Sequence, residues 1–123
     1  YSGIPCSVAA GLAMQDIIEK EDLINRSKEM SPYFLDALFS LKDIDGVTDI
    51  RGYGMMGGID LRTDERPGKA GYNCFKSLFA AGLSLKATGD CLIVAPPFIS
   101  EKKHIDEIVE KLRTGITNYF KSQ

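Results

Sequence analysis

One cationic side chain stands where it could bind a carboxylate. Lys86 precedes the polar turn Thr88-Gly89-Asp90, and a short apolar run, 91–95, follows that turn. A Gly-Asp pair between two such runs predicts a β-hairpin, with Lys86 at the end of its first strand. A lysine there could act as a point charge for a carboxylate in a neighbouring cleft, or it could simply be solvated. The residues alone leave both interpretations open.

Gly52, Gly54 and Gly57 match the GxGxxG spacing of dinucleotide-binding proteins. That fingerprint requires a helix directly after the glycines, because the N–H groups of its first turn bind the phosphates. Residues 58–62 instead alternate in polarity like a strand, and no acidic residue ends a second strand of a βαβ unit. We therefore interpret the glycines as a corner between two strands and reject a nucleotide site.

The other titratable side chains form no recognisable catalytic or metal-binding set. His104 is expected to be solvated in the first turn of a helix, with no nucleophile nearby to activate. Arg51 precedes the glycine corner on a mostly apolar strand, which favours a structural ion pair over a substrate contact. Four acidic residues are scattered over loops and strands: Asp45, Asp49, Asp60 and Asp64. No catalytic, cofactor-binding or metal-ligating residue is therefore assigned.

Composition and charge exclude several classes of protein. With 123 residues, of which 44% are hydrophobic and 26% charged, residues 1–123 are expected to form one domain with a core. The net charge of −2 and the absence of a basic block argue against binding to nucleic acid or a membrane surface, and no apolar stretch is long enough to span a bilayer. An odd cysteine count without a CxxC motif favours buried free thiols in the cytoplasm: Cys6, Cys74 and Cys91.

Hydrophobic periodicity predicts helices and strands in blocks. Helices are expected over 6–19, 23–41 and 72–79 and after Ser100, with an apolar stripe from 105 to 120, and strands over 47–51, 55–62, 83–86 and 91–95. Ser31-Pro32 should kink or restart the second helix with Ser31 as its cap, and Ser100 should cap the last helix. Gly82 suits a left-handed helix end, and Pro96-Pro97 a fixed exit from the last strand. This order predicts an α+β fold, a small mostly antiparallel sheet covered on one face by helices.

Several segments, taken in order, resemble the class III (omega-amino-acid) aminotransferases, which carry pyridoxal phosphate. The run from Lys86 to Pro97 resembles their carboxyl-terminal signature. Tyr1-Ser2-Gly3-Ile4-Pro5 resembles a Tyr-Ser-Gly-His-Pro segment, with Ile4 in place of the histidine. Residues 49–58 resemble an Arg-Gly-x-Gly-Leu-Met strand pair, and residues 105–108 resemble the final helix. The resemblance covers almost the whole chain.

The resemblance implies the carboxyl-terminal part of the small domain of a type I pyridoxal phosphate fold. The cofactor lysine of that fold lies in a large domain, upstream of the matched region, so the chain alone is expected to be inactive. The position of Lys86 is usually an arginine that holds the substrate carboxylate, which makes Lys86 the one substrate-binding residue that carries over. The complete enzyme would move an amino group from an omega-amino acid such as β-alanine to a keto acid such as pyruvate. Its implied partners are the large domain and further copies in a homo-oligomer.

Two other interpretations of the chain remain. It could be a non-catalytic remnant or split-gene product that serves as an interaction module. It could also be a small ligand-binding or regulatory domain, which should contain an internal βαβ repeat, and none is found. Because the chain begins with Tyr1 and not with methionine, its start is interpreted as a processed, truncated or excised boundary. Truncation would expose surfaces that are normally buried, so the apolar helix over 6–18 is expected to cause dimerisation or aggregation.

Overall fold

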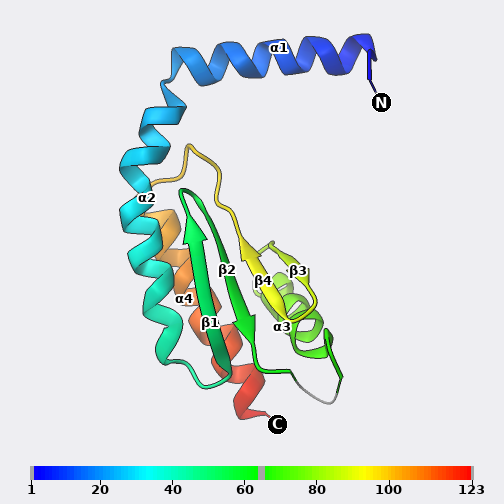
Figure 1. Ribbon diagram of the computed structural model, residues 1–123, viewed down its shortest axis with the longest axis vertical. Coiled ribbons are helices and arrows are strands. Elements are labelled where there is room, and N and C mark those ends of the chain that lie inside the picture. Colours follow the sequence, from blue (N-terminus) through cyan, green and yellow to red (C-terminus); the bar gives the residue numbers. More distant parts are fainter. Residues whose placement is uncertain (1, 64–65, 123) are drawn as a thin grey trace.

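A computed structural model describes residues 2–63 and 66–122, which form one small sheet and several helices (Figure 1). The elements are α1 (Pro5–Lys20), α2 (Leu23–Phe39), the 3-10 helix η1 (Ser40–Asp43), β1 (Val47–Tyr53), β2 (Met56–Leu61), α3 (Lys69–Ala80), β3 (Lys86–Thr88), β4 (Cys91–Val94) and α4 (Lys102–Lys121). The strands pair in the order β1-β2-β4-β3, and each neighbouring pair is antiparallel. The predicted α+β class with a small antiparallel sheet is therefore confirmed.

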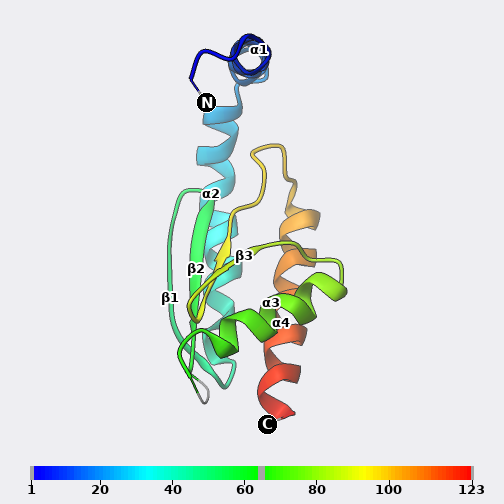
Figure 2. The same cartoon turned by 90° about the vertical axis from the view of Figure 1, so that its right-hand side faces the viewer.

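The two faces of the sheet have different surroundings. Side chains alternate along each strand, and Ile50, Ile59 and Leu92 point into the core. Helices α2, α3 and α4 lie against this face, as the turned view shows (Figure 2). In the described part of the chain no helix covers the opposite face, which we call the open face. The core holds the strands in register, so the residues of the open face have fixed positions.

The glycine corner is a hairpin, which confirms the predicted corner between two strands. β1 turns through Gly54, at a φ of 59°, directly into β2, so a strand and not a helix follows the glycines. Gly57 faces α2, and a Cβ atom there would lie 2.1 Å from Cδ2 of Leu38. The missing side chain allows the helix to pack closely on the sheet.

Helix α2 runs without interruption through Ser31 and Pro32, so the predicted restart at Ser31 is wrong. Pro32 lacks an N–H for the carbonyl of the preceding turn, which normally breaks a helix. Here Pro32 is on the exposed side, while Phe34 and Leu38 in the following turns are fully buried against the sheet. Packing of this face outweighs the lost hydrogen bond.

Helix α4 is capped by a different residue from the one predicted. Ser100 is buried in a turn, where its N–H donates to the carbonyl of Pro97 at 2.9 Å. The helix begins after Glu101, whose backbone N–H donates to Nδ1 of His104 at 3.0 Å. Ser100 lies in the turn that follows Pro96-Pro97, one residue before the N-cap position, and Glu101 occupies that position instead.

The segment between α3 and β4 also differs from the prediction. α3 begins at Lys69, three residues before the predicted start, and β3 begins at Lys86, where the predicted strand ends. The end of α3 explains the later strand. Gly82, at a φ of 81°, donates its N–H to the carbonyl of Phe79, and Leu83 donates to that of Leu78 at 2.9 Å. The left-handed helix end predicted at Gly82 is thus confirmed. Because Gly82 and Leu83 form this helix end, the strand begins later than predicted.

Helix α1 projects away from the sheet and contacts mainly α2 (Figure 1). The chain turns between the two helices at Asp22, which has a φ of 49°, and Asn25 donates to its carboxylate at 2.9 Å. No residue of α1 is buried, so the prediction of a buried thiol is wrong for Cys6; Cys74 is buried and Cys91 half-buried. None of the described helices is long and apolar enough to cross a membrane.

Candidate functional site

The strand register places two cationic residues in one row on the open face. Arg51 pairs with Gly58, Gly58 with Ile93, and Ile93 with Lys86, so the row crosses all four strands. These residues alternate with the core residues, and therefore belong to the open face. Neighbouring strands lie about 4.8 Å apart, which puts the backbones of Arg51 and Lys86 about 14 Å apart. A glycine and a half-buried isoleucine lie between them.

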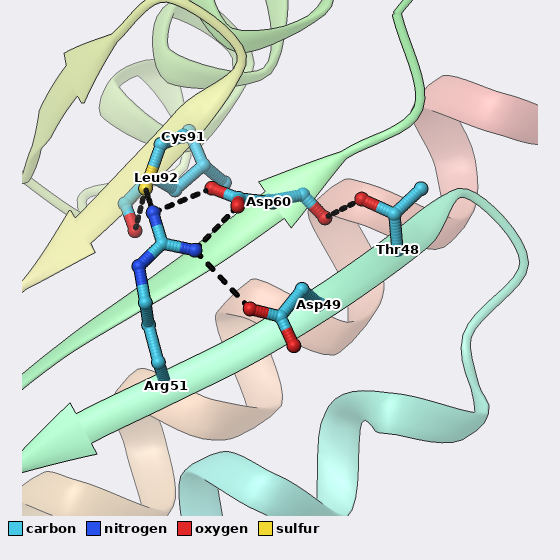
Figure 3. A network of polar contacts seen from close by, with 6 residues as sticks. All are labelled: Thr48, Asp49, Arg51, Asp60, Cys91 and Leu92. Atoms are coloured by element: carbon cyan, nitrogen blue, oxygen red, sulfur yellow. Dashed lines mark hydrogen bonds and ion pairs between the residues drawn. The ribbon is translucent and has the colours of Figure 1, made fainter.

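Arg51 is neutralised by two carboxylates (Figure 3). Its guanidinium lies over Gly58 and forms a two-pronged ion pair with Asp60, in which Nη2 lies 3.0 Å from Oδ1. Nη1 also reaches Asp49 at 3.2 Å. The Arg51 guanidinium lowers the pKa of Asp60, and the same hydrogen bond raises the pKa of Arg51. The structural ion pair expected for Arg51 is thus confirmed.

Cys91 lies beside this ion pair without being activated by it. Nη2 of Arg51 points at its sulfur from 3.6 Å. Burial, and then the nearby Asp60 carboxylate, raise the pKa of the Cys91 thiol to about 11. The thiolate is the nucleophilic form of cysteine, so at neutral pH this side chain is protonated and inert.

Replacement of Asp60 with asparagine is expected to reduce the acid dependence of stability. The folded-state pKa of Asp60 is lowered, so its ion pair stabilises the fold above the unfolded-state pKa, and this contribution is lost as the pH falls through the folded-state pKa. Because the Arg51 side chain is 58% exposed, the loss at neutral pH should be about 1 kcal/mol or less.

Urea unfolding at neutral and strongly acidic pH measures this difference. The difference in the free energy of unfolding between the parent and Asp60→Asn should disappear in acid, because the side chain at position 60 is then uncharged in both proteins. Asp36→Asn, on the exposed side of α2, is the matched control and should show no pH-dependent gap. A gap of the same size at both pH values would contradict the assignment.

Lys86, the candidate carboxylate ligand, is the first residue of β3 and is exposed. Within residues 2–63 and 66–122, no carboxylate forms an ion pair with it. It borders a pocket of about 430 Å³ between β3 and the first turns of α3. The other lining residues are Gly68, Tyr72, Phe75, Leu85, Ala87 and Gly89. Lys86 thus borders this pocket together with two aromatic residues, Tyr72 and Phe75.

The remaining candidate residues do not join this site. Asp45 pairs with Arg62 at 2.9 Å, and Asp64 lies outside the described residues. His104 is exposed and serves in the cap of α4. Among the residues with described positions, no group of three or more His, Cys, Asp or Glu side chains could hold a metal ion.

Sequence reasoning missed the role of Asp90. The pattern indicates only a turn residue, whereas the carboxylate accepts hydrogen bonds from two backbone amides at the start of α3, those of Gly68 and Gly71. The available signal was an aspartate next to Gly89 in a short turn, but its donors come from about 20 residues earlier in the chain. Only the packing of α3 against the hairpin brings them together.

Comparison with known proteins gives consistent matches along the chain. The family model "Aminotransferase class-III" matches residues 1–116. An omega-aminotransferase of Caulobacter vibrioides is 39% identical over 116 residues, covering 92% of this chain and 26% of that protein. An omega-amino acid–pyruvate aminotransferase of Pseudomonas putida is 33% identical over 115 residues, covering 89% of this chain and 25% of its own length.

A solved structure of a transaminase variant with SMBA superimposes with a TM-score of 0.90 and 30% identity. The superposition covers 98% of this chain and 30% of the transaminase. The chain thus spans about a quarter of the length of the curated relatives it matches. Because almost all residues superimpose, the projecting α1 is part of the shared fold.

Proposed function

The chain belongs to the class III aminotransferase family, and from this premise we propose that residues 1–123 are one domain, the carboxyl-terminal small-domain part of a pyridoxal-phosphate-dependent enzyme. The complete enzyme would transfer an amino group from an omega-amino acid such as β-alanine to a keto acid such as pyruvate. The names of the relatives from Caulobacter and Pseudomonas support this substrate class. The extensive match to proteins about four times longer supports the assignment to a part of such an enzyme.

In this proposal Lys86 binds the substrate carboxylate. One observation carries the assignment: of the two cations in the row on the open face, Arg51 is neutralised by Asp49 and Asp60, whereas Lys86 has no carboxylate partner in the described chain. An unpaired ammonium group can exchange water for a substrate carboxylate without first breaking an ion pair. Lysine provides one point charge where an arginine would provide two parallel hydrogen bonds, so binding through Lys86 is weaker and less directional.

The described residues do not fit the pyridoxal phosphate site itself. The lysine that forms a Schiff base is activated by desolvation or by a neighbouring cation. No lysine is buried in the described part of the chain, and Arg51, which could meet a phosphate, is already neutralised. We therefore place the cofactor, which supplies the electron sink for amino transfer, on the remaining three quarters of the enzyme, and the isolated chain is proposed to be inactive.

The proposed partners are that large domain and further copies of the enzyme, in the cytoplasm. α1 supplies the surface that supports this part of the proposal. Five large apolar side chains lie exposed along and just before it: Ile4, Val8, Leu12, Met14 and Ile17. An exposed apolar surface of this kind usually marks an interface.

The isolated chain is expected to self-associate through α1. Leu12 is 65% exposed, so Leu12→Glu should shift the chain toward the monomer in sedimentation experiments at high concentration, because it places a charge in the apolar stripe. Phe79→Glu is the matched control, since Phe79 is 62% exposed on α3, away from α1, and should leave association unchanged. A strictly monomeric parent chain would contradict the expectation.

A graft tests the proposed function. In this graft the chain replaces the matched segment of the Caulobacter omega-aminotransferase, and transamination of β-alanine with pyruvate is measured after loading with pyridoxal phosphate. The proposal predicts a folded, cofactor-loaded and active graft. A folded and loaded graft without transaminase activity would instead favour the alternative, a non-catalytic remnant or interaction module.

A further inference from the structure

Asp90 connects the hairpin that carries Lys86 to the start of α3. Its carboxylate accepts three hydrogen bonds from another part of the chain: the N–H of Gly68 at 2.9 Å, the N–H of Gly71 at 3.1 Å and the hydroxyl of Thr63 at 3.1 Å. Its backbone carbonyl accepts the N–H of Leu61 at 2.9 Å. One residue thus holds the β3–β4 turn, the end of β2 and the first turn of α3 together. We call these contacts the Asp90 clamp.

The clamp builds the pocket beside Lys86. A Cβ atom on Gly71 would lie 2.2 Å from the carbonyl oxygen of Gly89, so the first turn of α3 sits directly on the hairpin turn. The clamped Gly68 and the turn residue Gly89 both line the pocket that Lys86 borders. Its aromatic wall, Tyr72 and Phe75, comes from the same first turns of α3. The separation of α3 from the hairpin, and with it the shape of the pocket, therefore depends on Asp90.

The clamp also determines which groups the carboxylate of Asp90 contacts. Asp90 is four residues from Lys86 in the same hairpin and could have neutralised it, but both carboxylate oxygens face donors on the other side. Partial burial acts to raise the pKa of Asp90, but the hydrogen bonds from Gly68, Gly71 and Thr63 outweigh it and lower the pKa. The carboxylate is thus ionised at neutral pH and is satisfied by amide and hydroxyl donors.

We propose that Asp90 is a positioning residue for substrate binding: it fixes the hairpin against α3 and withholds its own carboxylate from Lys86, which leaves the lysine charge for the substrate. This inference rests on the proposed role of Lys86 in carboxylate binding. It predicts that Asp90 acts through Lys86, so its effect should depend on the presence of both the lysine and a substrate carboxylate. A residue with only a structural role would affect all substrates alike.

A double-mutant cycle in the graft tests the coupling. In Asp90→Asn, KM for β-alanine should rise about fivefold, because the charge-assisted contact between Lys86 and the substrate carboxylate is weakened. The kinetics with a primary amine that has no carboxylate should stay unchanged. In the Lys86→Ala background, Asp90→Asn should have no further effect on KM. Asp45→Asn, which removes the exposed partner of Arg62, is the matched control and should leave both substrates unaffected.

The outcomes separate this inference from the proposed function. If Lys86→Ala itself leaves KM for β-alanine unchanged, the role of Lys86 fails and the inference fails with it. If Lys86→Ala raises KM but Asp90→Asn has no effect, acts equally on both substrates, or acts equally in both backgrounds, only the role of Asp90 is overturned. If Asp90→Asn prevents folding, Thr63→Val takes its place, because it removes one of the three donors to the Asp90 carboxylate. KM for β-alanine should then rise about twofold, while the kinetics with the primary amine stay unchanged.

Discussion

Lys86→Ala is expected to lower kcat/KM for β-alanine by about tenfold to a hundredfold in the graft, the range of one hydrogen bond to a charged group. The reason is the charge distribution on the open face. Arg51, the other cation in the row, is held by Asp60 and lies about 14 Å away, so it cannot substitute for Lys86. Steady-state kinetics with varied β-alanine and saturating pyruvate measure the loss.

Two further variants show whether the loss reflects a carboxylate contact. Lys86→Arg should retain or increase activity, because the guanidinium can form two parallel hydrogen bonds to a carboxylate. Lys42→Ala, an exposed lysine in η1 far from the pocket, should behave like the parent. If Lys86→Ala lost as much activity toward an amine without a carboxylate, the role proposed for Lys86 would be wrong.

Gly71→Ala is expected to cause the largest loss of stability, about 2–3 kcal/mol. Alanine usually stabilises the interior of a helix relative to glycine by about 0.5–1 kcal/mol. Here the added methyl group would meet the carbonyl oxygen of Gly89 at 2.2 Å and the Cα of Asp90 at 3.0 Å, both backbone atoms that cannot rotate away. α3 would have to move off the hairpin, which would also break the Asp90 clamp.

Urea unfolding of the isolated chain, followed by circular dichroism, measures this loss. The matched control is Gly11→Ala in α1, where no atom lies within 4 Å of the added Cβ. It should be neutral or stabilising by about 0.5–1 kcal/mol. Equal stability of Gly71→Ala and the parent would mean that α3 does not rest on the hairpin turn as described.

The parts of the fold that were predictable from the sequence depend on local patterns. The α4 stripe follows from helical periodicity, and Ile105, Leu112 and Ile116 are fully buried as that pattern requires. The β3–β4 hairpin follows from the turn chemistry of Gly89-Asp90. The strand that follows the glycine corner was also predictable, because the polarity of the residues after Gly57 already indicated it.

The errors arose where contacts between distant segments outweigh local preference. The continuation of α2 through Pro32 depends on Phe34 and Leu38, which pack against a sheet that comes later in the chain. Likewise, a serine before a helix predicts a cap, but Ser100 is already used in the turn that follows the prolines. For Cys6, the cysteine count favoured a buried thiol, but this residue lies on α1, which projects away from the sheet and buries no residue.

The candidate site was predictable only in part for the same reason. Lys86 was identified from its turn and from a family resemblance, and its role in binding stays a prediction. The two contacts that define its surroundings could not be derived from spacing. Arg51 meets Asp60 through strand pairing, and Asp90 meets Gly68 and Gly71 through packing of α3 on the hairpin.

Reductive trapping of pyridoxal phosphate tests the central claim most directly, namely that this chain is a substrate-binding part of an aminotransferase whose cofactor lysine lies elsewhere. The isolated chain and the graft are each incubated with pyridoxal phosphate, reduced with borohydride and mapped by peptide mass spectrometry. We expect no preferred lysine in the isolated chain and one stoichiometric adduct in the graft, outside residues 1–123. A single stoichiometric adduct at one lysine of the isolated chain would contradict this claim, because the chain would then build a cofactor site of its own.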